Sequence, residues 1–245
     1  MIQNRFIPCL LLKNHGLVKT KKFVNYKYIG DPINAIKIFN DKYVDEIIIL
    51  DIDASKEKRG PDFAFLQSLA SECFIPLAYG GGVSSLNEIE QLIQIGIEKV
   101  IINHSALNSF SFISDAISHF GSSTIVGAID VKKNIFGQQR VFNHVTMKNT
   151  SFTPIEIAKK YAELGVGEIF LNNVDLDGTM LGYDLNLIKE VSEVVQVSLI
   201  ASGGASSKKN MMEAIKYGAS ASSAGALFVF QGPHNAVLIN YPFES

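Results

Sequence analysis

The sequence predicts an α/β fold, a closed (βα)8 barrel, from an alternation of elements and from an internal repeat. Short apolar runs alternate with amphipathic segments along the 245 residues. Alternating βα units make the strands parallel, because each helix must cross over the sheet. A glycine turn also occurs twice, as Tyr79-Gly80-Gly81-Gly82-Val83-Ser84-Ser85 and as Ala201-Ser202-Gly203-Gly204-Ala205-Ser206-Ser207.

The second turn lies 122 residues after the first, and one shift relates other positions as well. It takes Glu46 to Glu168, Asp53 to Asp175 and Gly96 to Gly218. We interpret this shift as the duplication of a half-barrel. Eight units with twofold repetition favour a closed barrel over an open sheet. They predict one domain over residues 1–245, with half-barrels at about 1–122 and 123–245.

The elements of the first half follow from local signals. Residues 5–11 form a strand, because the apolar run is too short and dense for a surface helix. A long basic loop is expected over 13–30. Asp31-Pro32 begins the first helix, with Asp as N-cap and Pro at the first helical position, and Pro61 begins the second. The other expected strands are 46–51, 75–79, 99–102 and 124–129, and the other expected helices are 84–95 and 109–119.

The second half repeats the pattern after a polar excursion. Residues 132–150 are polar and broken, and Phe136-Gly137-Gln138 predicts a hairpin within this long loop. Helices are expected at 154–164, 186–194 and 206–217, and strands at 168–172, 197–201 and 220–224. After Phe228 the chain contains Gly232-Pro233, so the last helix is expected to be short or irregular.

Composition excludes several classes of function. The net charge of −2 gives no reason to expect nucleic-acid binding through bulk charge. No apolar run approaches the roughly 18 residues that span a membrane, and the N-terminus does not resemble a signal peptide, so a cytoplasmic protein is expected. Cys9 and Cys73 are expected to be reduced core residues. No cluster has metal-ligand spacing, and no metal or cofactor is expected.

Two glycine pairs are candidate phosphate sites. The loops after barrel strands carry the site in such folds, and Gly81-Gly82 and Gly203-Gly204 occupy them. Glycine lets backbone amides approach an anion closely, and the following helix N-terminus adds donors. Alternatively, both pairs only make tight turns. The residues expected to complete one pocket are Asn103 and His104, and those of the other are Gly225 and Asp177-Gly178-Thr179. Two facing pockets imply a long substrate with a phosphate at each end.

Four predicted strands begin with a charge, namely Arg5, Glu46, Lys99 and Glu168. Two positive and two negative charges at the amino-terminal end of the barrel can pair across its axis and plug it. The residues alone favour a layer that supports stability, because this end of a barrel usually does so. Buried ion pairs are nevertheless weak evidence for a role in stability alone.

The order and spacing of the motifs resemble one family over essentially the whole chain. The motifs are Arg5…Cys9-Leu10, Val18-Lys19, Gly30-Asp31-Pro32, Leu50-Asp51-Ile52, Ala54-Ser55, Gly80-Gly81-Gly82, Asp130, Asp177-Gly178-Thr179, Gly182-Tyr183-Asp184 and Ala201-Ser202-Gly203-Gly204-Ala205. They are similar to the cyclase subunit of imidazole glycerol phosphate synthase, the HisF family.

The resemblance implies a barrel that receives ammonia from a class I glutaminase subunit. In the family, ammonia reacts with a bisphosphorylated ribonucleotide to give imidazole glycerol phosphate and an aminoimidazole carboxamide ribotide. The resemblance adds Lys19, Asp51 and Ser202 to the phosphate and substrate-binding residues. The four charges at the strand starts match the family's gate, so the resemblance also implies that ammonia enters between them.

One catalytic position departs from the family. The family has an acid–base pair of aspartates at the ends of strands one and five. Asp130 matches the second, but Leu11 stands where the first is expected. Leucine carries no transferable proton, and acid–base groups commonly contribute about 10²–10⁴-fold to a rate. The pattern resembles a HisF-like branch associated with amidination of bacterial surface sugars, in which the barrel works with a glutaminase and a separate sugar amidotransferase.

Other interpretations stay open at this point. A histidine-pathway cyclase would reassign the acid–base work to Asp130, Asp51 or Asp53. A non-catalytic barrel would only dock the glutaminase and pass ammonia onward. A single-chain sugar-phosphate isomerase is disfavoured by the ring of charges. His15 and His144 lie in expected loops and could be catalytic, but a lone loop histidine is more often solvated.

Overall fold

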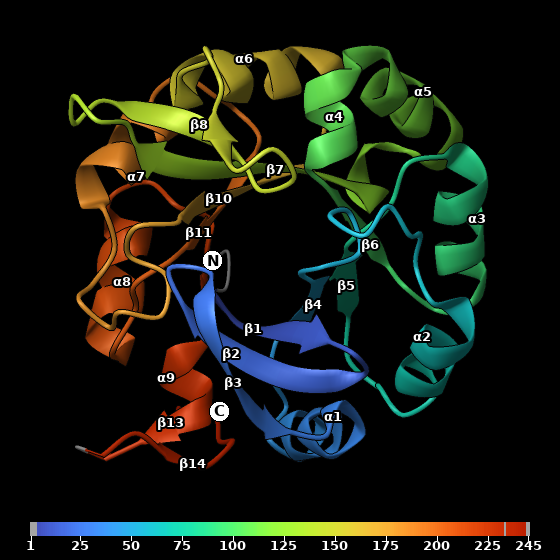
Figure 1. Cartoon of the computed structure of the whole chain (residues 1–245), viewed down its shortest axis with the longest axis vertical. Helices are drawn as coiled ribbons and strands as arrows, with labels where there is room; N and C mark the ends of the chain where they lie inside the picture. Colours follow the sequence, from blue (N-terminus) through green and yellow to red (C-terminus); the bar gives the residue numbers. More distant parts are fainter. Residues whose placement is uncertain (1–3, 233, 244–245) are drawn as a thin grey trace.

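The computed structural model describes residues 4–232 and 234–243 and forms the predicted closed barrel. Figure 1 shows it end-on, with the helices arranged as an outer ring around the strands. The barrel strands are β1 (Arg5–Lys13), β4 (Ile47–Asp51), β5 (Leu77–Gly80), β6 (Lys99–Ile102), β7 (Ile125–Lys133), β10 (Glu168–Asn173), β11 (Ser198–Ser202) and β12 (Ala221–Ala224). They pair in this order, all parallel, and β12 pairs with β1 to close the barrel.

The helices largely confirm the sequence signals. They are α1 (Pro32–Asp41), α2 (Phe63–Ala70), α3 (Leu86–Gln94), α4 (His104–Asn108), α5 (Phe110–Phe120), α6 (Pro154–Leu164), α7 (Leu185–Ser192), α8 (Lys208–Lys216) and α9 (Ala226–Val229). The side chain of Asp31 caps α1 as predicted. The predicted start of α2 at Pro61 is wrong, because Asp62 accepts the hydrogen bond of the first turn and Phe63 is the first helical residue.

The expected loop over 13–30 is also wrong. It forms a β-hairpin, β2 (Gly16–Lys21) and β3 (Val24–Gly30), and β2 continues the sheet antiparallel to β1. The turns at Asn14-His15 and Lys22-Phe23 have positive φ at all four residues but contain no glycine. The usual hairpin signal in the sequence was therefore missing.

The excursion over 132–150 contains the predicted hairpin. β7 extends past the barrel and pairs antiparallel with β8 (Gln139–Asn143), and the turn between them contains Gly137. β8 also pairs with β9 (Lys148–Asn149). At the end of the chain α9 is short, as expected, and is followed by β13 (Phe230–Gln231) and β14 (Ala236–Val237). Pro233 lies outside the described residues.

The two glycine turns lead into helices that begin in the same way. Ser85 caps α3, and Ser207, 122 residues later, caps α8. In the first turn Ser84 donates to Glu88, and in the second Ser206 donates to Asn210, again at the same shift. This correspondence of side-chain contacts supports the predicted half-barrel repeat. No helix in the described part of the chain has the length and apolar character needed to cross a membrane.

The barrel has two apolar layers. The larger fills the space between the strands and the helices. The smaller fills the interior of the barrel and consists of Ile7, Cys9, Ile48, Ala78, Ile101, Val126, Ala128, Phe170, Ile200 and Ala221. Both cysteines are free thiols, and burial raises the pKa of Cys9 to about 12. The interior is therefore lined by groups that stay uncharged at neutral pH.

Gly127 of β7 generates a prediction about packing. A Cβ at this position would lie 2.5 Å from the ring of Tyr161, which is fully buried in α6. Gly127→Ala should therefore lower the free energy of unfolding by about 1–3 kcal/mol, the usual cost of overpacking. The measurement is the midpoint of urea unfolding followed by circular dichroism. In a Tyr161→Leu background the same substitution should lower the free energy of unfolding by clearly less. An equal decrease would show that the contact with the Tyr161 ring does not cause the destabilisation.

Candidate active site at the barrel mouth

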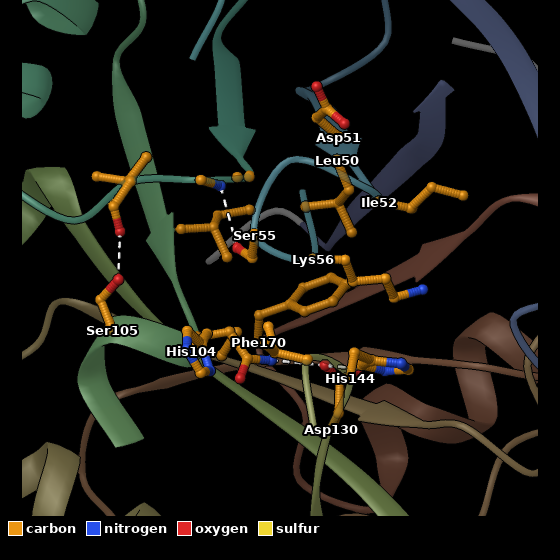
Figure 2. A pocket seen from close by; sticks show the side chains of 18 of the residues that line it. Leu50, Asp51, Ile52, Ser55, Lys56, His104, Ser105, Asp130, His144 and Phe170 are labelled. Carbon is orange, nitrogen blue, oxygen red and sulfur yellow. Dashed lines mark hydrogen bonds and ion pairs between the residues drawn. The ribbon is translucent and has the colours of Figure 1, made fainter. Parts of the chain in front are cut away.

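A cavity opens at the carboxyl ends of β4 to β7. The predicted site residues that line it are Asp51, Gly81, Gly82, Asn103, His104 and Asp130. Residues that sequence reasoning did not assign to it include Phe23, Lys56, Ser105, His144 and Phe170. Figure 2 shows polar side chains from several elements pointing into this one space. These six predicted residues thus come together at the mouth.

Asp130, at the outer end of the barrel portion of β7, holds a network of polar side chains. Asn103 donates to its Oδ2 over 2.5 Å, and Asn172 of β10 donates to its Oδ1 over 2.7 Å. Nε2 of His144 lies 3.5 Å from Oδ2. Burial acts to raise the pKa of Asp130, but His144 and the two amide donors outweigh it, and the pKa is lowered. Asp130 is therefore held as a carboxylate.

His144 is the residue that sequence reasoning misjudged most. The expectation of a solvated loop histidine is wrong, because its side chain is only 18% exposed. Its ring lies 4.5 Å from the ring of Phe23 and 4.9 Å from that of Phe142, measured between centroids. The loop between β8 and β9 brings it over the mouth, and only the pairing of β7 with β8 places that loop there.

The carboxylate of Asp51 is already occupied by protein groups. It accepts two hydrogen bonds from the guanidinium of Arg59, over 2.8 and 3.0 Å, and one each from the backbone amides of Asp53 and Ala54. Hydrogen bonds to Asp51 and Glu57 raise the pKa of Arg59. Asp51 thus shapes the loop after β4 and neutralises Arg59, although one side of it faces the cavity.

The glycine turn after β5 is a place where only glycine fits. A Cβ on Gly81 would lie 2.7 Å from the carbonyl oxygen of Asp51, and one on Gly82 would lie 2.3 Å from that of Arg59. Both residues also have positive φ. The backbone amide of Gly82 donates to Oγ of Ser55 over 3.3 Å. The close approach of these backbones brings the turn to the cavity wall.

A smaller cavity lies on the side of the second half. It is lined by four of the predicted residues, Lys19, Asp177, Ser202 and Gly225. Nζ of Lys19 lies 3.2 Å from both carboxylate oxygens of Asp177, so this lysine is neutralised by the protein. Phe23, Leu50 and Phe170 line both cavities and separate them.

The other predicted residues of the second half lie behind this smaller cavity and line neither of the two. Gly178 packs under the backbone of Thr20, where a Cβ would lie 2.1 Å from a carbonyl oxygen. The hydroxyl of Thr179 donates to the carbonyl of Leu176 over 2.7 Å. Gly203 and Gly204 pack against the backbones of Asn173 and Gly182. The two halves of the mouth are therefore not equivalent in size or access.

At the opposite end of the barrel, four charges form a closed ring. Arg5 donates to Glu46 over 2.9 Å and to Glu168 over 2.5 Å, and Lys99 donates to the same two carboxylates over 2.8 and 2.9 Å. Burial raises the pKa of Glu46 despite its two cationic neighbours. Its Oε1 is buried and has no hydrogen-bond partner among the described residues. The interior apolar layer separates this ring from the mouth.

Leu11 lies at the mouth of the barrel. Leu11 is buried, lines the smaller cavity, and pairs with Leu50 of β4 and Val18 of β2. It therefore places an apolar side chain at the rim where the resemblance implies a carboxylate.

Over residues 4–232 and 234–243, no three His, Cys, Asp or Glu side chains are grouped so that they could hold a metal ion.

Comparison with known proteins gives consistent matches along the chain. A family model described as histidine biosynthesis protein matches residues 5–233. The imidazole glycerol phosphate synthase subunit HisF of Alkaliphilus metalliredigens is 40% identical over 229 residues, covering 93% of this chain and 91% of the relative. A proposed subunit hisF2 of that synthase from Pseudomonas aeruginosa is 47% identical over 243 residues, covering 99% and 97%. A proposed HisF subunit from Leptospira interrogans is 43% identical over 244 residues, covering 99% and 96%. The chain therefore belongs to the histidine biosynthesis protein family, among its HisF-like imidazole glycerol phosphate synthase subunits.

Proposed function

We propose that this protein is the synthase-type subunit of a glutamine amidotransferase complex and serves the amidination of a surface-polysaccharide sugar. Ammonia released by a class I glutaminase enters at the ring of charges, crosses the barrel, and is used at or beyond the mouth. A separate sugar amidotransferase completes the conversion of an acetamido to an acetamidino group. The observation that carries the proposal is Leu11, an apolar residue at the mouth of a barrel whose ring of charges is complete.

The path for ammonia is supported by the contents of the barrel. The entrance ring consists of ion pairs that are held by four side chains from four strands, so the movement of one lysine can open it. Above it, the interior layer is apolar, which favours neutral ammonia over ammonium. The layer ends at Ala128 and Phe170, which line the mouth cavity together with Asp130.

The substrate-binding part of the proposal rests on the mouth residues. Gly81, Gly82, Asn103 and His104 would hold one phosphate of a phosphorylated ligand. Lys19, Ser202 and Gly225 would hold a second in the smaller cavity, after Lys19 has left Asp177. The remaining predicted residues, Asp177, Gly178, Thr179, Gly203 and Gly204, would shape that second pocket.

A second candidate is the histidine-pathway cyclase, which is favoured by the name of the relative from Alkaliphilus metalliredigens. In that case acid–base catalysis would proceed without a carboxylate at position 11. A third candidate is a barrel that only docks the glutaminase and conducts ammonia.

The deciding assay mixes the protein with its glutaminase and supplies the histidine-pathway ribotide or nucleotide-linked acetamido sugars, each with glutamine or ammonium chloride. Turnover of the ribotide alone would replace our proposal with the second candidate.

The entrance ring generates the first functional prediction. Lys99→Ala should change glutamine-dependent product formation more than ammonium-dependent formation, because only the former needs transfer through the ring. Lys99→Arg, which keeps the charge, should change it less, and Lys209→Ala, on the exposed surface of α8, should not change it. Rates with both nitrogen sources are compared after circular dichroism has verified the fold. Equal effects on both would mean that the ring is only structural.

Two exposed aromatic residues near the ring generate a prediction about the partner. Tyr43 and Phe74 are each 81% exposed and lie in the loops that precede β4 and β5, at the same end as the ring. The side chain of Asn40 bonds to backbone groups of Glu72 and Phe74 and so ties the second loop to α1. Exposed aromatic side chains commonly dominate interfaces.

Replacing both Tyr43 and Phe74 with Ala should weaken the complex with the glutaminase by about 30-fold in Kd, or about 2 kcal/mol. The measurement is isothermal titration calorimetry. The matched control replaces Ile135 and Phe136, which are 94% and 80% exposed at the turn between β7 and β8. An equal loss in the control would contradict docking at the ring end.

Leu11 generates the sharpest functional prediction. The natural protein should cyclise the histidine-pathway ribotide very slowly, even with saturating ammonium chloride. Leu11→Asp should raise that rate to a detectable level, whereas Leu11→Asn, of the same size but without a titratable proton, should not. Asp130→Asn should abolish the restored rate. The scale is about 10²–10⁴-fold, or about 3–5 kcal/mol of barrier. A natural rate within tenfold of an ordinary family member would show that position 11 is dispensable.

A further inference from the structure

Two histidines line the mouth cavity, and they differ in how their ring nitrogens are used. In His104, Nδ1 lies 3.2 Å from the amide nitrogen of Asn143 and Nε2 lies 2.9 Å from that of Asn108. In His144, Nε2 is buried and has no hydrogen-bond partner in the described part of the chain. The Asp130 carboxylate lies 3.5 Å from it. His144 is thus the histidine whose protonation is not restricted by an amide partner.

The position of His144 is set by packing. Its ring contacts the aromatic rings of Phe23, from the turn between β2 and β3, and Phe142 of β8. Contacts with two aromatic rings restrict the rotation of the imidazole while leaving the cavity side open. Figure 2 draws His144 beside Asp130 at one wall of the pocket, with Phe170 nearby. A group held in this way at the end of the apolar interior is placed to meet a reactant.

Asp130 itself is poorly suited to carry the proton. Each of its oxygens accepts a hydrogen bond from a side-chain amide, of Asn103 and Asn172, and these bonds favour the ionised form. Its lowered pKa keeps it a carboxylate at neutral pH. A proton on Nε2 of His144 faces this negative charge, which favours that tautomer. The second carboxylate expected for a pair is replaced by Leu11.

We propose that His144 is the acid–base residue of this mouth and that Asp130 orients it. The proposal rests on the proposed function in one respect, because it assumes that ammonia reaches the mouth. Addition of ammonia to an electrophilic carbon forms a C–N bond, the π electron pair of that carbon's double bond moves to the attached heteroatom, and the new nitrogen is positively charged. Nδ1 of His144 takes one proton from that nitrogen, the electron pair of the broken N–H bond stays on the nitrogen, and the imidazolium returns the proton to the leaving group or to water.

The geometry supports this division of roles. With Nε2 turned toward Asp130, Nδ1 is the nitrogen that exchanges protons with a reactant. The 3.5 Å separation is longer than an ordinary hydrogen bond, but such catalytic contacts are often long before the reactant binds. The other charged or titratable groups of the cavity are Asp51, Lys56 and His104, and Asp51 is neutralised by Arg59. Lys132 lies over the ring of Phe142 at 4.7 Å.

The first readout requires no turnover. In protein labelled with ¹³C at the aspartate carboxyl carbon, the Asp130 signal is assigned with Asp130→Asn and its pKa is measured by NMR titration. His144→Gln should raise the pKa of Asp130, because the imidazole that lowers it is gone. His119→Gln, at the exposed end of α5, is the matched control and should leave the titration unchanged. An unchanged Asp130 pKa in His144→Gln overturns the pairing and the proposal with it.

The second readout is catalytic. In the reconstituted system with the glutaminase, the sugar amidotransferase, nucleotide-linked acetamido sugars and ammonium chloride, His144→Gln should lower kcat by about 10²–10⁴-fold while KM changes less than about threefold. The acidic limb of the pH profile should disappear, and added imidazole should partly restore the rate of His144→Ala. A kcat of His144→Gln within threefold of the natural protein overturns the proposal. If the natural protein supports no amidination, the proposed function fails. The titration of Asp130 then decides alone whether His144 and Asp130 interact as proposed.

Discussion

Closure of the barrel between β12 and β1 is the constraint on which the rest of the structure depends. Closure points every second side chain of eight parallel strands inward and brings all their carboxyl ends to one rim. The inward-pointing side chains can pack only against one another. The interior is therefore filled by small and aliphatic side chains and by Phe170. Charges can enter only at the two ends, where they meet partners or solvent. The ring at one end and the Asp130 network at the other both follow from this geometry.

The two ends handle their buried charges differently. At the ring, two cations and two carboxylates pair with each other, and the charges balance within a closed set. At the mouth, Asp130 is balanced by neutral amides and one imidazole, which keeps it ionised without a permanent cation. The ring is thus a closed set of ion pairs, whereas Asp130 lies beside an imidazole whose Nε2 has no hydrogen-bond partner among the described residues.

The mouth is also asymmetric, although the sequence suggests a repeat. The hairpin of β2 and β3 lies over the second half, brings Lys19 to Asp177 and inserts Phe23 between the two cavities. The loop between β8 and β9 reaches the first half and supplies His144. These two additions to the barrel interrupt the repeat where they occur. They divide the mouth into an open part that contains titratable groups and a smaller part in which a lysine is already paired.

The sequence by itself determined the barrel, its glycine turns and most helix starts, because these depend on local periodicity, capping and backbone freedom. Asp31 caps α1 and Ser85 caps α3 through contacts within four residues, and Gly81 is needed where two backbones meet. The ring charges were also recognisable, since each stands at the first residue of a strand or, for Glu46, directly before it. Only the tertiary structure decided what the polar residues of the mouth do. Asp51 is hydrogen-bonded to Arg59 and Lys19 to Asp177, while His144 faces Asp130, from which it is separated by the 13 residues 131–143. Those partners are set by strand pairing and by non-glycine turns, whose signals in the sequence are weak, and so the surroundings of His144 could not be derived before the fold was known.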